Sequence, residues 1–378
     1  MRFNKILVTG GAGFIGSYLV DRLISQGYNV RILDNLTEQV HQNKTPEYLN
    51  KKAEFIKGDV TSYEDIEKAL DGVDAIYHEA SVVGVGQSMY QIEHYAFHNN
   101  LGTARLLDYL ANRKHSVKRI FVASSMSAYG EGLYKCPKDG FIRPDLRTDD
   151  QMSQERWKPL CPKCNSILTP VGIPETESFR CNSIYAVTKQ SQEDMVMIFG
   201  KAYGIPATAL RYFNVYGPRQ SLSNPYTGVA AIFLSRLKNN NPPVVYEDGL
   251  QTRDFISVYD IADANLACLE DEKAYGKVFN LGTGNPVAIK EIAEILAGLL
   301  GKNIKPDIQN KFRSGDVRHC SADISLIKNT ISWQPSWSFE KGMQDLIDWG
   351  KKQTSEDLFE KASKELKSKG LLKTYLLP

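Results

Sequence analysis

Short apolar runs alternate with longer amphipathic segments along most of this chain. The apolar runs are predicted strands, and they lie at 6–9, 29–33, 54–57, 75–78, 119–124, 207–213 and 278–281. The segments with helical spacing of apolar residues lie at 18–23, 63–70, 96–112, 229–238, 289–300 and 339–349. This alternation predicts an α/β protein with a Rossmann-type, doubly wound parallel sheet, whose ligands bind beyond the carboxyl ends of the strands.

Composition and charge exclude several classes of protein. The 378 residues are 42% hydrophobic and 24% charged, which is ordinary for a folded globular chain with a large core. A net charge of +2 gives no bulk attraction to nucleic acid or to an anionic membrane. No apolar run approaches the length of about 20 residues that crosses a bilayer. We therefore expect a cytoplasmic protein with small-molecule partners, and with neither nucleic acid nor membrane as a partner.

The first predicted strand runs into a glycine-rich turn at 10–16, which leads into a helix. Gly10 permits a tight turn, Gly13 allows a pyrophosphate to approach the backbone, and Gly16 allows close helix packing. Asp34 ends the second strand, where a carboxylate binds the adenosine ribose and favours NAD over NADP. A glycine triplet alone is weak evidence, and Asp34 could instead be a turn residue at a strand end. The whole strand–turn–helix context favours a dinucleotide site.

Tyr185 and Lys189 are four residues apart, so in a helix they share one face and can act as an acid/base unit. A phenol has an ordinary pKa of about 10, and an adjacent ammonium group favours its ionised form. We therefore predict that Lys189 lowers the pKa of Tyr185 for chemistry at a hydroxyl or carbonyl group. Two amphipathic residues that share a helix face by chance are the alternative interpretation of this pattern alone.

Further motifs occur in order around this pair. They are Thr9-Gly10-Gly11-Ala12-Gly13-Phe14-Ile15-Gly16, Asp34-Asn35-Leu36, Gly58-Asp59-Val60, Ser124-Ser125-Met126-Ser127-Ala128-Tyr129-Gly130, Arg211-Tyr212-Phe213-Asn214-Val215-Tyr216-Gly217-Pro218 and Arg253-Asp254-Phe255. Together they resemble the extended short-chain dehydrogenase/reductases that act on nucleotide sugars, and the likeness extends to about residue 349. The resemblance implies a bound NAD, a nucleoside diphosphate sugar between the sheet and a smaller C-terminal α/β domain, and a homodimer.

The resemblance also implies two sets of binding residues. The expected NAD site comprises Gly10, Gly13, Phe14, Ile15, Gly16, Asp34, Asn35, Asp59, Val60, Ala80, Asn99, Tyr185 and Lys189. The expected substrate site comprises Val85, Gly86, Ser125, Met126, Ser127, Asn214, Gly228, Val229, Arg253, Arg313 and Asp316. A simple crossover loop at 81–88, and surface arginines at 253, 313 and 318, are the alternative interpretations.

The residues after the fifth strand separate the reactions of this family. Ser125 matches the catalytic Ser/Thr, which can hydrogen-bond the sugar oxygen. Met126 and Ser127 stand where the 4,6-dehydratases have an Asp and a Glu, and neither moves a proton efficiently near neutral pH. Tyr185 and NAD then support hydride transfer alone, which predicts 4-epimerisation through a transient ketone. The resemblance is greatest to enzymes that convert dTDP-L-rhamnose to dTDP-6-deoxy-L-talose. A UDP-hexose or UDP-uronate 4-epimerase, a reductase or dehydrogenase, and a non-catalytic NAD-binding module stay open.

An insertion at 131–183 departs from the family pattern and contains four of the six cysteines. Cys136, Cys161, Cys164 and Cys181 can form the closed tetrahedral thiolate shell of a structural Zn²⁺ in a zinc-ribbon-like subdomain. Four reduced thiols, or a redox pair at Cys161 and Cys164, are the alternatives. Because Cys181 precedes Tyr185 by four residues, we expect the zinc to anchor the start of the catalytic helix.

Three regions follow from these patterns. We expect an NAD-binding Rossmann domain at 1–183, including the insertion, and a segment at 184–350 that contributes the catalytic helix, the remaining sheet and the nucleotide-sugar domain. Residues 351–378 are rich in Lys, Glu and Ser with spaced leucines, which predicts an appended amphipathic helix. Packing on the parent domain or on a dimer partner is its expected role, and a membrane surface or another partner is the alternative.

Overall fold

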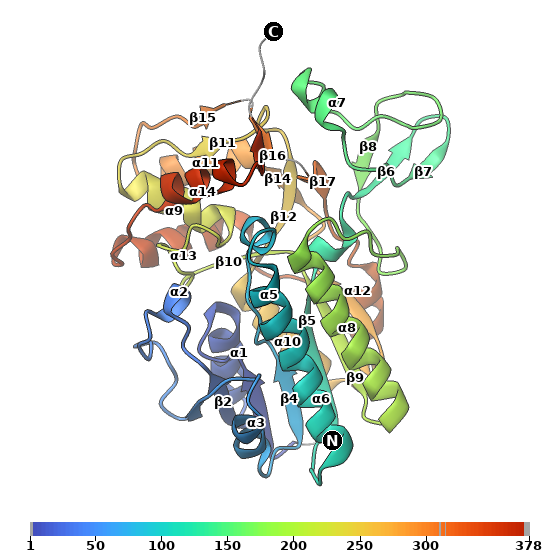
Figure 1. The fold of residues 1–378 in the computed structure, drawn as a ribbon, viewed down its shortest axis with the longest axis vertical. Coiled ribbons are helices and arrows are strands. Elements are labelled where there is room, and N and C mark those ends of the chain that lie inside the picture. Colours follow the sequence, from blue (N-terminus) through green and yellow to red (C-terminus); the bar gives the residue numbers. More distant parts are fainter. Residues whose placement is uncertain (1–2, 310, 314, 374–378) are drawn as a thin grey trace.

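A seven-stranded parallel sheet forms the larger part of the computed structural model, which describes residues 3–309, 311–313 and 315–373 (Figure 1). Its strands, in order across the sheet, are β13 (Val278–Leu281), β9 (Ala207–Tyr212), β5 (Arg119–Ser125), β4 (Ala75–His78), β1 (Lys5–Thr9), β2 (Asn29–Asp34) and β3 (Glu54–Lys57). The strand order reverses between β1 and β4, and a ligand crevice opens at such a reversal. The predicted doubly wound sheet is therefore confirmed.

Helices cover both faces of this sheet. On one face lie α1 (Phe14–Ser25), α10 (Val258–Glu270) and α12 (Ser325–Ile331), and on the other lie α3 (Tyr63–Leu70), α6 (Gly102–Asn112) and α8 (Ile184–Tyr203). Ile6 and Val8 of β1 pack toward the first set, whereas Leu7 packs toward the second. Because both faces are buried, β1 is a continuous apolar run from Ile6 to Val8.

A smaller unit with its own core sits above the carboxyl ends of the strands (Figure 1). Its sheet contains β10 (Asn214–Tyr216), β12 (Thr252–Ser257), β14 (Pro286–Ala288) and β17 (His319–Cys320), and its helices are α9 (Val229–Lys238), α11 (Ile289–Leu299) and α13 (Phe339–Lys351). Two small ladders pair β11 (Val244–Val245) with β15 (Asp307–Ile308), and β16 (Phe312–Arg313) with β18 (Leu372–Lys373). The chain enters this unit, returns to the large sheet at β13, and enters it again.

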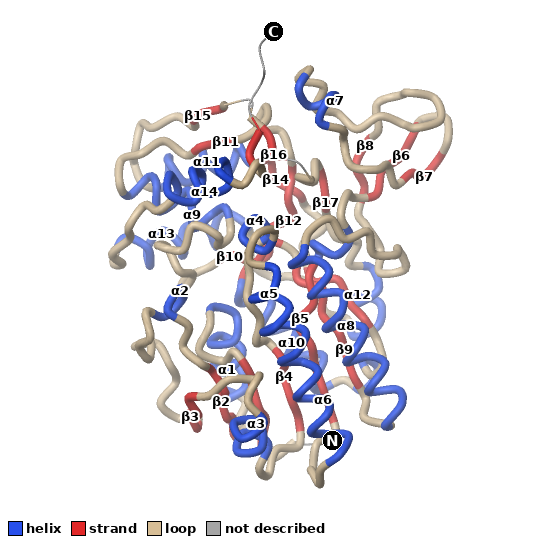
Figure 2. Tube along the Cα trace, in the orientation of Figure 1, coloured by secondary structure: helices blue, strands red, loops and turns tan. Residues whose placement is uncertain are grey.

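The insertion between β5 and α8 stands to one side of both units (Figure 1). It contains an antiparallel sheet of β7 (Gly140–Ile142), β6 (Leu133–Cys136) and β8 (Thr169–Val171), together with the short helix α7 (Asp149–Ser153). Figure 2 shows that loops make up much of the remainder. A small cluster of buried side chains, which includes Tyr134 and Leu168, fills the space between these strands and loops.

Two predicted helices differ from the structure. The segment 96–112 begins as a π-helix, η1 (Ala96–Leu101), before α6. The predicted terminal helix is shorter than expected, because α14 spans only Phe359–Ser368. It packs on the parent domain, where Tyr226 donates to Glu365 at 2.9 Å, and residues 374–378 lie outside the described part of the chain. None of the described helices is long and apolar enough to cross a membrane.

Candidate functional site

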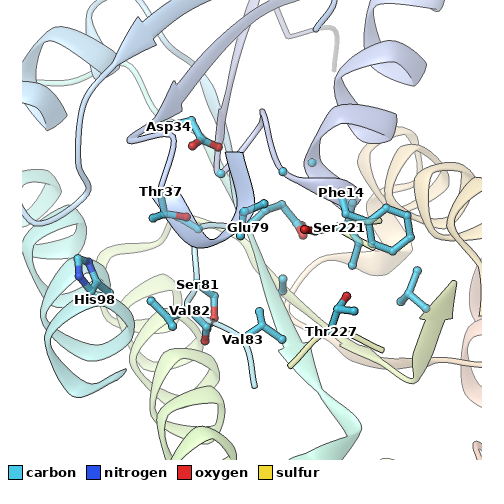
Figure 3. Close-up of a pocket in the computed structure, with 18 of the residues that line it drawn as sticks. Phe14, Asp34, Thr37, Glu79, Ser81, Val82, Val83, His98, Ser221 and Thr227 are labelled. Carbon is cyan, nitrogen blue, oxygen red and sulfur yellow. Dashed lines mark hydrogen bonds between the residues drawn. The ribbon is translucent and has the colours of Figure 1, made fainter. Parts of the chain in front are cut away.

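A cavity of about 400 Å³ lies beyond the carboxyl ends of the central strands. Figure 3 shows residues that line it, among them Asp34, Glu79 and the segment 81–83. Many of the residues expected in the NAD and substrate sites line this one cavity: Gly10, Gly13, Phe14, Ile15, Gly16, Asp34, Asn35, Asp59, Val60, Ala80, Ser125, Tyr185, Lys189, Asn214 and Gly228. The fold therefore brings together residues that are more than 200 positions apart in the sequence.

The glycine turn leaves no space for side chains at two positions. Gly10 has a φ of +69°, and a Cβ there would lie 2.8 Å from the backbone nitrogen of Ala80. A Cβ on Gly16 would lie 2.3 Å from the carbonyl oxygen of Gly10. α1 begins at Phe14, and no side chain caps its N-terminus. Backbone N–H groups at such an end can bind a phosphate.

Two carboxylates are fixed beside the turn. Asp34 accepts hydrogen bonds from the backbone nitrogens of Ala12 at 3.0 Å and Leu36 at 2.9 Å. Asp59 accepts a hydrogen bond from Asn35 at 2.7 Å. Burial opposes ionisation of Asp59, but hydrogen bonds from Asn35 and Thr61 outweigh it and hold the pKa of this carboxyl below its usual range. Both groups are thus preorganised acceptors at the rim of the cavity.

Tyr185 and Lys189 lie on the first turns of α8, as predicted. Ser183 caps the helix by accepting from the nitrogen of Ala186, and the nitrogen of Tyr185 donates to Ser88 at 3.0 Å. Burial raises the pKa of Tyr185 to about 12, and a hydrogen bond with Ser125 acts in the opposite direction. The tyrosine is therefore held in place by backbone contacts and shielded from water.

The expected effect of Lys189 on Tyr185 is not found in this structure. Lys189 donates to Gln192 at 2.9 Å, and burial lowers its pKa to about 8 although Glu79 and Glu193 act against the shift. No contribution from Lys189 accompanies the raised pKa of Tyr185. Burial of the phenol therefore dominates, and the pKa of Tyr185 is raised rather than lowered.

Ser125 connects Tyr185 to a second hydroxyl group. The nitrogen and the hydroxyl of Ser127 both donate to Oγ of Ser125, at 3.2 and 2.9 Å. Met126 does not line the cavity and packs in a small apolar cluster with Tyr129. Neither of the two residues after Ser125 therefore offers an acid or base to the cavity.

Glu79 is a candidate site residue that the sequence analysis missed. It follows β4 directly, lines the cavity and accepts a hydrogen bond from Tyr212 at 2.8 Å. Burial raises its pKa to about 7, against the hydrogen bond from Tyr212 and the charge of Lys189. An acidic residue immediately after a fully buried strand is a signal that could have identified it.

Three expected ligands lie near the cavity without lining it. Asn99 is buried behind the segment 81–83, where its amide pairs with the backbone nitrogen and oxygen of Val82 at 2.7 and 3.1 Å. Val85 and Gly86 belong to the short helix α4 (Val85–Ser88), and Gly86 faces Leu366 of α14. Asn99 therefore holds the wall of the cavity in place, and its direct contact with a cofactor is not supported.

The expected phosphate-binding residues of the smaller unit also lie outside the cavity lining, as does Val229, the first residue of α9. Arg253 donates to the carbonyl oxygens of Thr252, Val317 and Arg318. Arg313 and Asp316 form an ion pair at 2.9 Å. Arg318 is buried and forms ion pairs with Glu247 and Asp248. The alternative interpretation of Arg318 as a surface arginine is therefore wrong.

The four predicted zinc ligands are not all together. The cluster in the structure instead comprises Cys136, Cys161, Cys164 and Asp139, whose ligand atoms lie within 4.8 Å of one another. Cys181 lies outside this group, because its thiol donates to Gln190 of α8 and to the carbonyl oxygen of Ala128. The prediction that Cys181 is the fourth ligand, and with it the anchoring of α8 by zinc, is wrong.

Comparisons with known proteins agree with this geometry. Residues 6–148 match the NAD dependent epimerase/dehydratase family, and residues 168–346 match the GDP-mannose 4,6 dehydratase family. A dTDP-L-rhamnose 4-epimerase from Burkholderia thailandensis is 36% identical over 349 residues, which are 92% of this chain and 94% of that protein. The chain belongs to the NAD-dependent epimerase/dehydratase family.

Solved structures extend the likeness to the whole fold of this epimerase. A UDP-glucose 4-epimerase from Thermotoga maritima, solved with UDP-glucose, has a TM-score of 0.76 and 30% identity, covering 92% of this chain and 99% of that one. A UDP-glucuronic acid 4-epimerase from Bacillus cereus, solved with UDP-glucuronic acid and NAD, has a TM-score of 0.72, 28% identity and the same coverage. The chain is therefore an NAD-dependent enzyme of the nucleotide-sugar 4-epimerase group, whose members are isomerases.

Proposed function

We propose that this epimerase interconverts dTDP-L-rhamnose and dTDP-6-deoxy-L-talose, and that NAD stays bound through each turnover. The observation that carries the proposal is the placement of Tyr185 and Ser125 in one cavity, with Ser127 donating to Ser125 and no acid or base at the two positions after Ser125. It offers a proton acceptor for a sugar hydroxyl without the acid and base that a dehydratase needs. The similarity to the Burkholderia thailandensis enzyme supports the choice of sugar.

The turn and its surroundings fit NAD. Gly10 and Gly16 form a cradle that a Cβ would fill, and the uncapped start of α1 can hold the pyrophosphate. Asp34 would accept hydrogen bonds from the adenosine ribose, where a carboxylate would repel the 2′-phosphate of NADP. When bound, NAD supplies a hydride acceptor, and its positively charged nicotinamide ring favours an ionised phenol nearby.

The side chains of this chain supply the proton chemistry. Tyr185 removes the proton from the hydroxyl at C4 of the sugar, and Ser125 hydrogen-bonds the same oxygen as its charge changes. Lys189, charged below a pKa of about 8, supports the phenolate when the cofactor site is filled. The ketone must then turn over before hydride returns to its opposite face.

The substrate end of the cavity suits a neutral sugar attached to a diphosphate. Val82 and Val83 line the cavity, whereas Met126, one of the expected substrate-binding residues, does not. Among the described residues that line it there is no arginine, so the carboxylate of a uronic acid finds no guanidinium partner. Oδ1 of Asn214 is buried without a hydrogen-bond partner and lines the cavity, which supports its contact with the substrate.

The expected homodimer is supported by exposed apolar side chains on adjacent helices. Ile92 lies on α5 (Ile92–Tyr95), Phe97 on η1, and Ile198 and Tyr203 on α8, and all four are exposed. These helices pack side by side, so the side chains can form one patch for a second copy. We expect light scattering to give twice the mass of the chain, and Ile198→Asp to reduce it to that of a monomer.

Incubation with sugar nucleotides, followed by NMR of the product, tests the proposed reaction. Purified protein without added NAD should invert C4 of dTDP-L-rhamnose and should leave UDP-glucuronate almost unchanged. Denaturation of the protein should release NAD in nearly stoichiometric amount. Comparable turnover of UDP-glucuronate would contradict the proposed sugar, and normal turnover by Tyr185→Phe would contradict the proposed mechanism.

A further inference from the structure

The insertion contains two copies of one short motif. Cys136-Pro137-Lys138-Asp139-Gly140 and Cys161-Pro162-Lys163-Cys164-Asn165 agree at their first three positions. Gly140 has a φ of +76° and Asn165 a φ of +56°, so both copies end in a left-handed residue. In each turn the side chains at the first and fourth positions, Cys136 and Asp139 in one and Cys161 and Cys164 in the other, meet in one cluster. Asp139 takes the place in the first turn that Cys164 takes in the second.

We propose that Cys136, Asp139, Cys161 and Cys164 bind one structural Zn²⁺, with Asp139 as the oxygen ligand of a three-sulfur, one-oxygen site. Zinc accepts thiolate and carboxylate ligands, and a tetrahedral site that protein ligands close completely is structural rather than catalytic. The site holds the two turns of the insertion together. It lies in a different part of the fold from the catalytic cavity.

The distances suit a single tetrahedral ion. Oδ2 of Asp139 lies 3.3 Å from Sγ of Cys136 and 3.2 Å from Sγ of Cys161, and the sulfurs of Cys136 and Cys164 are 3.5 Å apart. With Zn–S bonds of about 2.3 Å and Zn–O bonds of about 2.0 Å, a tetrahedron places two sulfurs about 3.8 Å apart, and a sulfur and an oxygen about 3.5 Å apart. A disulfide would need the sulfurs at about 2.05 Å.

The surroundings of the thiols also suit negatively charged sulfur. The backbone nitrogen of Lys138 donates to Sγ of Cys136 at 3.4 Å, and those of Lys163 and Cys164 donate to Cys161. Such N–H groups stabilise thiolate ligands and fix their orientation. Lys163 also interacts with the charge of Asp139. Lys163 therefore offsets part of the excess negative charge of three thiolates and a carboxylate.

The insertion is hydrogen-bonded to the segment 315–319 of the smaller unit. Glu131 accepts hydrogen bonds from the backbone nitrogens of Arg318 and His319, and Tyr134 of β6 donates to Glu131. Arg147 donates to the carbonyl oxygen of Asp316 at 3.0 Å. Loss of zinc should therefore loosen the segment 315–319 while Tyr185 stays in place, in contrast to the effect first expected from Cys181.

Metal analysis of the purified full-length protein tests the site directly. After removal of metal and reconstitution with Zn²⁺ alone, we expect one ion per chain. Cys161→Ser and Cys164→Ser should weaken zinc binding at least tenfold, and Asp139→Ala should weaken it about tenfold. Cys181→Ser should bind zinc like the wild type. Absence of zinc from the reconstituted wild type, or its loss in Cys181→Ser, would overturn the proposal.

Asp139→Cys keeps the test valid even if the cysteine variants fail to fold. This substitution should retain one zinc ion, because it makes the two turns alike. With Co²⁺ in place of zinc, its thiolate charge-transfer band should be about a third stronger than that of the wild type, since four sulfurs replace three. Equal bands in the two proteins would show that Asp139 is not the fourth ligand. Zinc binding by Asp139→Ala as tight as that of the wild type would exclude it as well.

Discussion

Oγ of Ser127 donates a hydrogen bond to Oγ of Ser125 at 2.9 Å, and the backbone nitrogen of Ser127 approaches the same oxygen at 3.2 Å. With both donors directed at its lone pairs, Ser125 can use its own proton toward Tyr185 or toward a sugar oxygen. By the chain's resemblance to the dehydratases of this family, Ser127 stands where those enzymes have a glutamate, and here it orients the hydroxyl group of Ser125.

Removal of these two hydroxyls should have unequal effects. Ser125→Ala should lower kcat by about 10²–10³-fold, because the contact with the reacting oxygen is lost. Ser127→Ala should lower kcat by only about 2–10-fold with little change in KM, since the backbone donor to Ser125 remains. Steady-state kinetics with NMR detection of the product would measure both. Ser127→Thr is the matched control, because it retains the hydroxyl. If Ser127→Thr were as slow as Ser127→Ala, the orienting role of this hydroxyl would be contradicted.

Glu79 should shape the pH profile of the reaction. Its carboxylate favours the ammonium form of Lys189, whose pKa burial lowers to about 8. Glu79→Gln removes this support, so the pKa of Lys189 should fall further. We expect the alkaline limb of kcat/KM to move to lower pH by about one unit. Glu93→Gln, at an exposed position, is the control, and identical alkaline limbs in all three proteins would exclude coupling between Glu79 and Lys189.

The same carboxyl should give a matching signature in stability. The pKa of Glu79 is raised from 4.5 to about 7 in the folded protein, so the folded state holds this proton more tightly than the unfolded chain. By linkage, its contribution to the free energy of unfolding declines as pH rises from about 4.5 through 7. Urea unfolding should therefore show that Glu79→Gln gains stability relative to the wild type between these pH values.

Much of the fold could be predicted because its strands are buried on both faces. The bounds of β3, β4 and β13 agree with the sequence-based ranges, because each strand contains adjacent apolar residues, which point to opposite faces of the sheet. The features that the sequence did not predict depend on contacts between residues far apart in the chain. Asp139 could not be separated from an ordinary turn residue, because its partners lie 22 and 25 positions away. Likewise, burial rather than sequence spacing sets the pKa of Tyr185.

Gly16 should be irreplaceable in the dinucleotide turn. A Cβ there would lie 2.3 Å from the carbonyl oxygen of Gly10 and 2.9 Å from Cα of Gly11, and both are backbone atoms that cannot rotate away. Gly16→Ala should therefore displace α1, weaken NAD binding at least tenfold and lower the free energy of unfolding by about 1–3 kcal/mol. Bound nicotinamide released from the denatured protein, together with urea unfolding, would measure the two effects.

Gly298 provides the matched control for this substitution. It lies in α11, and apart from its chain neighbours and the backbone of its own helix no atom lies within 4 Å of the position that its Cβ would take. Gly298→Ala should keep full NAD content and should stabilise the protein by about 0.5–1 kcal/mol, because alanine loses less backbone entropy in a helix. Equal NAD content in the two variants would show that the contact between Gly16 and Gly10 is not needed for the cofactor.

The terminal helix α14 should act on substrate binding through α4. Leu366 of α14 is buried, and its methyl group lies 3.4 Å from the Cβ position of Gly86. Ser88, in the same short helix as Gly86, accepts the hydrogen bond from the nitrogen of Tyr185. On the other side, Glu365 accepts from Tyr226, which lines the cavity. α14 therefore supports the cavity from outside at two places, through α4 beside Tyr185 and through Tyr226.

Leu366→Ala should loosen the contacts of α14 with α4 and with Tyr226, and it should lower the stability of the fold because packing is lost. We expect the free energy of unfolding to fall by about 2 kcal/mol, at the low end for a buried leucine because α14 lies at the surface. KM should rise by about 3–10-fold, while kcat should change less, since no group that touches the sugar is altered. Leu326→Ala, on α12 with a side chain that is 40% exposed, is the control and should leave KM unchanged. If Leu366→Ala loses stability but keeps the wild-type KM, then α14 stabilises the fold without shaping the site.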